Sequence, residues 1–537
     1  MASLSDRTNK QIESIRSQQY KNAGKGEELK RRRAEVTVTL RKEKRDAILS
    51  KKRNIISDDP DNMEDLNTTE ELSDEALTIA EDELKDIANE FRKPGLTGDK
   101  LFDLYQRIRR VLSQNSSAPV DFLIKLRLLP VLINGLQSEN KKIVYEAAWS
   151  ITNVASGTSE HTKAVVEAGV IPILLQYLPE YRRHKEITEQ CIWALANIVG
   201  DSQEYRDLSI KRGLFKYMGN IMNDIKSLPI TIVRNIAWLF SNIARHRNVN
   251  TPEEIYGQSI KYIRDLLCYN DKSVKCDACW GLSYLIKDAK NEQLKYFANQ
   301  TVMHSMLSFL GSGDNSLILG ALRVIGRFAQ GTENYCDILI QSGIFKQVFP
   351  SIMTTKAYDT EILYNCIWVL SNVVAGPETH INEIVSCNLV PFIIKHLSSG
   401  ISRIRIECSW FLSNFVNGCS RHQIREIVKC GGVDAITKEL KNDTNNDYIC
   451  NLLECIFCIL DTYSSCIPEK LESIKDSIEE CGGLDVIEKF QLWDNEKISV
   501  LSNRMIEVFF QDDTSACGGD YDSEDHEQYP QSQRIEF

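Results

Sequence analysis

A tryptophan followed four residues later by an asparagine recurs along the chain. The first pair is Trp149 and Asn153 in AAWSITNVASGTSE, and the pattern returns in CIWALANIVGDS, NIAWLFSNIARH, CIWVLSNVVAG and CSWFLSNFVNG. Two neighbouring indoles can form a slot for the aliphatic stem of Lys or Arg, with a cation–π attraction of ~0.5–2 kcal/mol. A carboxamide offers both a donor and an acceptor to the backbone of a ligand. The pattern therefore predicts binding of an extended, basic peptide.

A single pair of this kind has a simpler interpretation. Positions i and i+4 share one face of a helix, so the Trp could pack in the core while the Asn ties down a turn. For one isolated pair we favour that interpretation. For a row of pairs we favour a ligand, because core positions tolerate Leu, Ile or Phe and packing does not require Asn at the same offset each time.

The spacing of the pairs indicates the elements that must position them. They return about every 44 residues, a period typical of armadillo and HEAT repeats. The gap between Trp280 and Trp368 is twice as long, so one repeat between them lacks its tryptophan. Each repeat begins with a Gly–apolar turn, as in EAGVIPILLQYL and QSGIFKQVFPSI, where Gly suits a positive φ. Pro172 and Pro391 suit the first turn of the helix that follows.

No repeat of this kind can bury its apolar face alone, so neighbouring repeats must stack. The sequence predicts an all-α fold, a right-handed superhelical solenoid of about ten armadillo repeats over residues 76–511. Equivalent helices would lie ~8–10 Å apart, and alternate side chains of an extended peptide recur at ~6.6 Å. Equivalent helices lie closer together on a concave face, so their spacing there roughly matches the spacing of alternate side chains of the peptide.

Acidic residues flank the predicted slots. Glu146, Asp277 and Glu407 each stand three residues before a tryptophan, and Asp201 follows the second Trp–Asn helix. A solvated helix face could also carry each of these acids. Together with the slots, they indicate a groove for a basic peptide.

Composition and motifs exclude several other classes of protein. The chain has 537 residues, no apolar run near the ~20 residues that span a bilayer, and no apolar segment of a secretory signal at its N-terminus. We therefore expect an intracellular protein without a membrane segment. Its eight histidines are scattered, and the motifs of P-loop, serine, zinc and cysteine enzymes are missing, so we expect no enzyme.

Sixteen cysteines are present, and two C-x-x-C pairs occur at Cys276/Cys279 and Cys455/Cys458. Both pairs lie inside helical patterns without a second pair nearby. We therefore favour core packing over a zinc site and expect no cofactor.

The net charge of −11 hides an asymmetry between two segments near the N-terminus. Residues 7–53 are basic, whereas residues 58–90 are strongly acidic. A basic arm can bind nucleic acid, an acidic protein, or the chain's own acidic surface. We disfavour direct nucleic-acid binding, because the arm lacks interleaved aromatic residues. Alone, residues 27–52 should be disordered or marginally helical, and an acidic partner could fold them into one long helix.

These residues resemble the importin-α family of nuclear import adaptors over almost the whole chain. WSITNVASGTSEHTKAVVEAG and WALANIVGDSQEYRDL are similar to its second and third armadillo repeats, and Gln18–Asn54 is similar to its importin-β-binding segment. The resemblance implies an adaptor that binds Lys/Arg-rich nuclear localisation signals, is linked to importin-β, and shuttles between cytoplasm and nucleus. It implies recycling by a nuclear export receptor, and a monomer in the self-inhibited form.

The resemblance also implies domains and site residues. The domains are an importin-β-binding arm (1–57), an acidic linker (58–75), an armadillo domain (76–511) and a disordered acidic tail (512–537). The major cargo site comprises Trp149, Asn153, Gly157, Thr162, Gln190, Trp193, Asn197, Asp201, Asn235, Trp238, Asn242, Asp277 and Trp280, of which Gly157, Thr162 and Asp201 match a lysine pocket. The minor site comprises Arg323, Trp368, Asn372, Glu407, Trp410 and Asn414. Importin-β binding falls to Arg31, Arg32, Arg33, Arg41, Lys42, Lys44 and Arg45.

Several positions depart from a uniform row. Tyr284 follows Trp280 where an Asn would stand, and Arg323 holds the missing tryptophan position, both as in the family. Arg327 falls where the family's minor site usually keeps an Asn, and Asn365 replaces an acid. Both changes disfavour a cationic ligand, so we predict a weak minor site and dominant binding at the major site.

The cluster Lys51, Lys52 and Arg53 itself looks like a localisation signal. Tethered to its own groove, it would compete with cargo at an effective concentration of order mM. Capture of the arm by importin-β would then free the groove for cargo. The runner-up function is a catenin-like armadillo scaffold that binds extended peptides without a transport role, although that class would favour a basic groove for acidic ligands.

Overall fold

The computed structural model describes residues 74–511, with gaps at 114–118, 247–252, 288, 290–292, 294–295, 355–358, 400 and 442–443. The basic arm, with the residues predicted to bind importin-β and to inhibit the groove, and the C-terminal tail lie outside the described residues. Within the described ranges every regular element is a helix and no strand occurs, which confirms the all-α prediction. The first helix, α4 (Asp74–Phe91), begins two residues before the predicted domain boundary.

The chain divides into two units, residues 1–426 and 427–537. Up to α27, which crosses the division, the further helices are α5 (Gly98–Leu112), α6 (Val120–Lys125), α7 (Leu128–Leu136), α8 (Lys141–Ala155), α9 (Ser159–Glu167), α10 (Val170–Tyr177), η1 (Leu178–Glu180), α11 (Lys185–Asp201), α12 (Gln203–Lys211), α13 (Leu214–Asn223), η2 (Ile225–Ser227), α14 (Ile230–Arg245), α15 (Glu253–Leu267), α16 (Lys272–Lys287), α18 (Gln300–Leu310), α19 (Asn315–Ala329), α20 (Glu333–Gln341), α21 (Ile344–Gln347), α22 (Phe349–Thr354), α23 (Thr360–Val373), α24 (Glu378–Ser386), α25 (Val390–Leu397), α26 (Ser402–Gly418) and α27 (Arg421–Lys429). In the second unit they are α28 (Gly432–Glu439), α29 (Asn446–Cys466), η3 (Pro468–Lys470), α30 (Leu471–Glu480), α31 (Leu484–Phe490), α32 (Glu496–Met505) and η4 (Ile506–Phe510).

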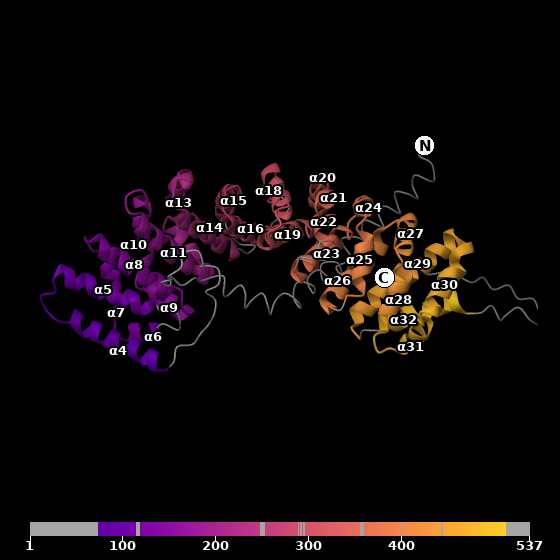
Figure 1. Ribbon diagram of the computed structural model, residues 1–537, viewed down its shortest axis with the longest axis horizontal. Coiled ribbons are helices and arrows are strands. Elements are labelled where there is room, and N and C mark those ends of the chain that lie inside the picture. The colour runs from indigo at the N-terminus through magenta and orange to yellow at the C-terminus, as the bar shows by residue number, and fades with distance from the viewer. Residues whose placement is uncertain are drawn as a thin grey trace, which may run out of the picture. The chain divides into compact units, whose positions relative to one another are not determined.

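A continuous stack of equivalent helices runs through the first unit. Helix α5 packs against α8, α8 against α11, and the series continues through α14, α16, α19, α23 and α26 (Figure 1). Each of these helices buries apolar side chains, and each repeat therefore covers the core of its neighbour, as expected of armadillo repeats. This stack positions the predicted cargo-site residues other than Gly157, which lies in the turn after α8, and Thr162, which lies in α9.

The turns between helices follow the predicted glycine pattern. Gly169, Gly343 and Gly431 have φ values of 78°, 75° and 74°, and each immediately precedes a helix. In two repeats other residues take a left-handed conformation at a turn, Arg127 with φ 60° and Asn388 with φ 55°. Pro391 is the second residue of α25, a position where a missing N–H costs no helical hydrogen bond.

Helix α29 is the core helix of the second unit, where it packs against α28, α30 and α32. Among the described residues it is the one helix long and apolar enough to cross a membrane, by length and composition only. About half of its apolar window, 56%, is buried inside the protein. Cys455 is buried in it, just as Cys279 is buried in α16. The described residues contain no group of three or more His, Cys, Asp or Glu that could hold a metal.

Candidate functional site

The predicted tryptophans lie on consecutive helices of the stack. Trp193 and Trp238, in α11 and α14, are buried, whereas the tryptophans at the equivalent positions of α8, α16, α23 and α26 are half-buried. Helix α19, which follows the helices of the predicted major site, carries Arg323 of the predicted minor site at this position. The structure thus brings the predicted indole positions into one row.

The asparagines of the row join neighbouring helices in a regular pattern. The side-chain Nδ2 of Asn197 donates to Thr152 O (3.0 Å), and that of Asn242 donates to Ala196 O (3.0 Å). In both cases the acceptor is the residue just before the asparagine of the preceding repeat. The same pattern joins Asn153 to Leu112 O (3.1 Å) and Asn414 to Ser371 O (2.9 Å).

This pattern corrects one step of the sequence argument. The expectation that packing does not require Asn at a fixed offset is wrong, because the amide locks the register of successive helices. Asn153, Asn197 and Asn242 are accordingly buried, with exposed fractions of 2%, 0% and 3%. A carboxamide has two N–H groups and a carbonyl oxygen, so this residue type can hold a neighbouring helix and also take part in other hydrogen bonds.

Two positions in the row break the pattern. Asn372 donates to Trp368 O of its own helix (2.8 Å) instead of to the preceding repeat. Tyr284 stands in the asparagine position after Trp280, and the two rings lie 5.8 Å apart. Both irregular positions adjoin α19, the helix that lacks the Trp–Asn pair.

The three residues of the predicted lysine pocket come from neighbouring segments. Thr162 in α9 is buried, and its hydroxyl donates to Ala155 O and to Thr158 O, each at 3.2 Å. Asp201, the last residue of α11, accepts a hydrogen bond from Ser159 Oγ (2.9 Å) at the start of α9. The carboxylate is therefore tied to the turn that contains Gly157.

Gly157 is required by a histidine that the sequence argument missed. A Cβ at this glycine would lie 2.3 Å from His161 Nδ1. That nitrogen accepts a hydrogen bond from the backbone N–H of Thr158 (3.1 Å), while Nε2 lies 2.8 Å from Asp121 Oδ1. The imidazole therefore holds the conformation of the turn at Gly157, which belongs to the predicted lysine pocket. A Gly-x-x-x-His spacing was the only signal for it in the sequence.

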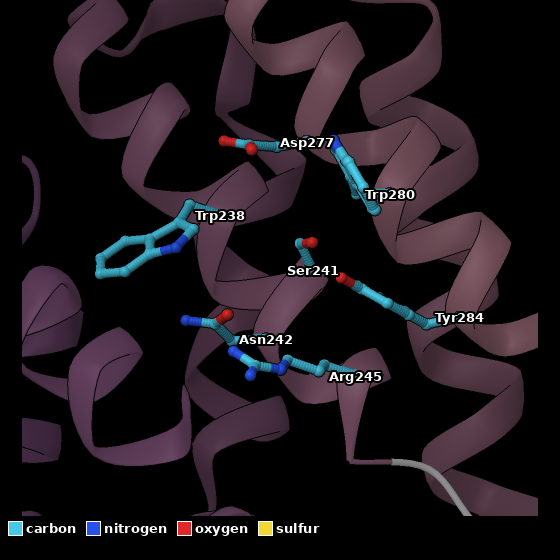
Figure 2. Close-up of a pocket in the computed structure, with 7 residues that line it drawn as sticks. All are labelled: Trp238, Ser241, Asn242, Arg245, Asp277, Trp280 and Tyr284. Carbon is cyan, nitrogen blue, oxygen red and sulfur yellow. The ribbon is translucent and has the colours of Figure 1, made fainter. Parts of the chain in front are cut away.

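A hollow of about 360 Å³, which includes solvent at its mouth, separates two of the indoles. Its lining residues are Trp238, Ser241, Asn242, Arg245, Asp277, Trp280 and Tyr284. Figure 2 shows Trp238 on one side and Trp280 with Tyr284 on the other, with Asp277 and Arg245 at opposite ends. The hollow lies where the sequence predicts a slot between two indoles, and a carboxylate stands at one end of it. Arg245, which was not predicted from the sequence, brings a cation to the other end.

Two further predicted positions, Gln190 and Asn235, are largely buried, with exposed fractions of 5% and 8%. The backbone carbonyl of Gln190 accepts a hydrogen bond from Thr152 Oγ1 (3.1 Å), which gives a second link between α8 and α11. Both predicted positions are therefore enclosed within the protein.

One predicted acceptor of ligand charge is already used within the chain. Glu146 is 5% exposed, and its Oε2 accepts a hydrogen bond from Arg109 Nε at 2.6 Å. The guanidinium of Arg109 also lies 4.6 Å from the centroid of the Trp149 ring. The expectation that Glu146 serves a ligand is therefore corrected, because a buried arginine from α5 neutralises it.

The predicted minor site carries arginines of the chain itself. The guanidinium of Arg323 stacks on Trp280 at 3.9 Å from the ring centroid, and Arg327 Nη1 donates to Gln330 Oε1 (2.9 Å). The predicted acid Glu407 is buried in α26, with an exposed fraction of 5%. Cations of the chain thus lie along the face proposed for a basic ligand.

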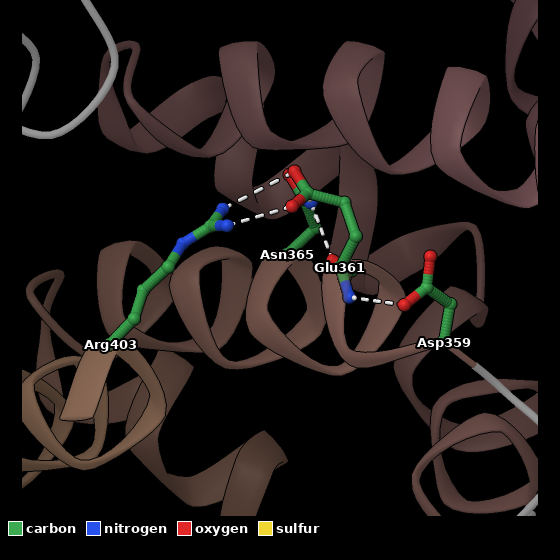
Figure 3. A network of polar contacts seen from close by, with 4 residues as sticks. All are labelled: Asp359, Glu361, Asn365 and Arg403. Carbon is green, nitrogen blue, oxygen red and sulfur yellow. Dashed lines mark hydrogen bonds and ion pairs between the residues drawn. The ribbon is translucent and has the colours of Figure 1, made fainter. Parts of the chain in front are cut away.

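Figure 3 shows how the remaining carboxylate near the minor site is engaged. Glu361 accepts hydrogen bonds from Arg403 at 2.8 and 3.2 Å and from Asn365 Nδ2 at 3.2 Å. Asn365 also donates to Glu361 O (2.7 Å), and Asp359 caps the start of the same helix. Burial works against the charged form, but the hydrogen bonds and charge of Arg403 outweigh it and lower the pKa of Glu361. This carboxylate is therefore held ionised in an internal ion pair.

Trp368 packs directly on the backbone of α19. A Cβ added to Gly326 would lie 1.9 Å from the ring of this indole. The helix without the Trp–Asn pair therefore needs a glycine to receive the tryptophan of the next repeat. No feature considered in the sequence argument indicated this contact.

Comparison with known proteins gives matches along the whole length of the chain. The model of the importin beta binding domain matches residues 16–93, that of the armadillo/beta-catenin-like repeat matches 116–156 and 158–200, and that of an atypical Arm repeat matches 472–528. Importin subunit alpha-2 of Caenorhabditis elegans is 34% identical over 527 residues, covering 97% of this chain and 96% of that protein. Importin subunit alpha-1a of Oryza sativa subsp. japonica is 27% identical, covering 95% and 94%.

Among solved structures, an engineered protein aligns with a TM-score of 0.68 at 21% identity. The match covers 79% of this chain and 98% of the engineered protein, and it supports the fold alone.

Proposed function

This chain belongs to the importin-α family, and we propose that it is a nuclear import adaptor that binds Lys/Arg-rich localisation signals along its Trp–Asn row. The N-terminal arm links the bound cargo to importin-β. We assign the chain no catalytic role, since importin-α proteins are transport adaptors.

The observation that carries this proposal is the slot between Trp238 and Trp280. Its two walls are aromatic, and Asp277 stands at one end. The stem of a Lys or Arg fits between apolar ring faces, while its charge is attracted to the rings and to the carboxylate. Asp201, held by Ser159, supplies a second carboxylate near Thr162 for the lysine that is bound most specifically.

The arm provides the second half of the adaptor. Its basic residues Arg31, Arg32, Arg33, Arg41, Lys42, Lys44 and Arg45 fall within the segment matched by the importin-β-binding model. We assign Lys51, Lys52 and Arg53 to competition with cargo for the groove. Binding of importin-β to the arm then favours cargo binding, and release of the arm favours cargo release. A nuclear export receptor would return the empty adaptor from the nucleus to the cytoplasm.

Co-elution of three components tests the adaptor function. A fluorescent Lys-rich peptide is mixed with importin-β, with and without the full chain, and the complex is separated by gel filtration. We expect the peptide to elute with importin-β only when the chain is present. Replacement of Arg31, Arg32 and Arg33 by Glu should remove importin-β but leave the peptide bound, whereas Asp201→Lys should release the peptide but leave importin-β bound.

An exposed arginine of the armadillo domain, Arg212, provides the control, and Arg212→Glu should change neither interaction. If the peptide eluted separately from the chain under every condition, the proposal would be contradicted.

A further inference from the structure

The hydrogen bonds of the asparagine row identify a residue that shares the register of the tryptophans. Asn197 bonds the carbonyl of Thr152, the residue before Asn153. Asn153 in turn bonds the carbonyl of Leu112, and also Ser113 Oγ (3.0 Å). Ser113 of the first repeat therefore corresponds to Asn153 of the second. Counting back four residues, Arg109 in α5 corresponds to Trp149 in α8.

Arg109 is held firmly at this position. Its Nε–Glu146 Oε2 distance is 2.6 Å, and the exposed fractions of the two residues are 9% and 5%. Its guanidinium lies 4.6 Å from the Trp149 ring centroid, on the face that a Lys or Arg of a ligand would otherwise use. The first four indoles of the row are those of Trp149, Trp193, Trp238 and Trp280. Their other end has the same arrangement, since the guanidinium of Arg323 in α19 lies 3.9 Å from the centroid of the Trp280 ring. The row is therefore bounded at each end by an arginine of the chain.

We propose that Arg109 determines specificity at the α5 end of the groove by filling the slot next to Trp149 with the chain's own cation. This inference rests on the proposed binding of basic peptides. A ligand residue that passes over Arg109 meets a guanidinium, which has only N–H donors and cannot accept a hydrogen bond from Lys or Arg, and the carboxylate of Glu146 is already engaged by Arg109. The position therefore selects against Lys and Arg and favours an acidic or neutral residue, so the basic run of a cargo ends here.

A purely structural role for Arg109, as a brace between α5 and α8, makes a different prediction. Loss of a brace would lower the stability of the protein and reduce its affinity for all peptides alike. Loss of a specificity determinant changes the relative affinity of two peptides that differ in charge at one position. The ratio of two dissociation constants is therefore the decisive quantity, and competition from the arm cancels in it.

The experiment titrates the full chain into fluorescent peptides and follows anisotropy. Each peptide contains one Lys-rich cluster extended by one further residue, either Lys or Glu. The added residue stands at the N-terminal end in one pair of peptides and at the C-terminal end in the other pair. For the end that runs over Arg109, the wild type should bind the Glu peptide about three- to fivefold more tightly than the Lys peptide, as expected for one partly screened charge pair. Arg109→Gln should reverse this preference, because it uncovers Trp149 and releases the carboxylate of Glu146.

A double variant separates the two contributions and avoids an unpaired buried carboxylate. Arg109→Gln with Glu146→Gln should bind both extended peptides about equally. The neighbouring exposed Arg110 supplies the control, and Arg110→Gln should keep the wild-type ratio. Wild-type ratios in both the single and the double Arg109 variants would overturn the inference. If the wild type bound none of these peptides, the proposed function itself would fail, and this inference with it.

Discussion

Asn197 in α11 donates a hydrogen bond from its side-chain amide to the backbone carbonyl of Thr152 in α8, at 3.0 Å. That carbonyl also accepts the backbone N–H of Ser156 at the end of its own helix. The side-chain amide of Asn197 therefore adds a bond between repeats to a carbonyl that already accepts a hydrogen bond at the end of α8. Because the pattern recurs in the next repeat with Asn242, the same residue type that we propose for ligand binding also sets the helix register.

Replacement of Asn197 by Ala should lower the free energy of unfolding by about 1–2 kcal/mol, since a buried hydrogen bond and its packing are lost together. The midpoint of urea unfolding, followed by circular dichroism, measures this change. Asn220 is an exposed asparagine on α13, and Asn220→Ala should leave the midpoint nearly unchanged. Equal midpoints for both variants would mean that the amide does not hold the register.

Replacement of Gly326 by Ala should lower stability by about 1–3 kcal/mol, because the added methyl group would lie 1.9 Å from the ring of Trp368. Gly257 in α15 is the matched control, because a Cβ there meets nothing within 4 Å. Gly257→Ala should be neutral or slightly stabilising, as expected in a helix. Thermal unfolding distinguishes the two, and equal melting temperatures would contradict the contact.

A cargo with two basic clusters should bind no more tightly than its single-cluster half, because Arg327 and Asn365 disfavour a cation at the minor site. Isothermal titration of the two peptides compares their affinities. The variant with Arg327→Asn and Asn365→Glu should give the longer peptide an advantage of several-fold, about 1 kcal/mol. The exposed Lys395 offers a control in Lys395→Gln. A large loss of wild-type affinity on removal of the second cluster would contradict a weak minor site.

Removal of residues 1–57 should raise the affinity for a Lys-rich peptide about tenfold or more, an increment of ~1.4 kcal/mol. The reason is that Lys51, Lys52 and Arg53 no longer compete from a short tether. Replacement of these three residues by Ala in the full chain should have the same effect, which separates the cluster from the rest of the arm. Unchanged affinity in both variants would refute self-inhibition.

The sequence was sufficient to predict the repeat architecture, because a fixed period of apolar residues, Gly turns and Trp–Asn pairs determines how helices stack. The positive φ of Gly169 and the place of Pro391 in the first turn of α25 follow from the backbone chemistry of single residues. The row of indole positions follows from the same period.

Contacts between neighbouring repeats could not be predicted in this way. The pairing of Arg109 with Glu146 joins residues 37 positions apart, and the first repeat carries no tryptophan to mark the position of Arg109. The contact of Gly326 with Trp368 depends on how closely α19 and α23 approach, which the residue pattern does not specify. The bond of each Asn to the preceding repeat likewise depends on the relative shift of two helices.

Selection of a basic over an acidic peptide tests the central claim most directly. Fluorescence anisotropy gives the affinity of the full chain for a Lys-rich peptide and for a twin in which every Lys is replaced by Glu. We predict that the wild type binds the Lys-rich peptide at least about tenfold more tightly. Asp201→Lys should lower the affinity for the Lys-rich peptide by a similar factor, because it places a like charge in the proposed lysine pocket. Equal or tighter binding of the acidic twin by the wild type would contradict the account and favour a catenin-like scaffold.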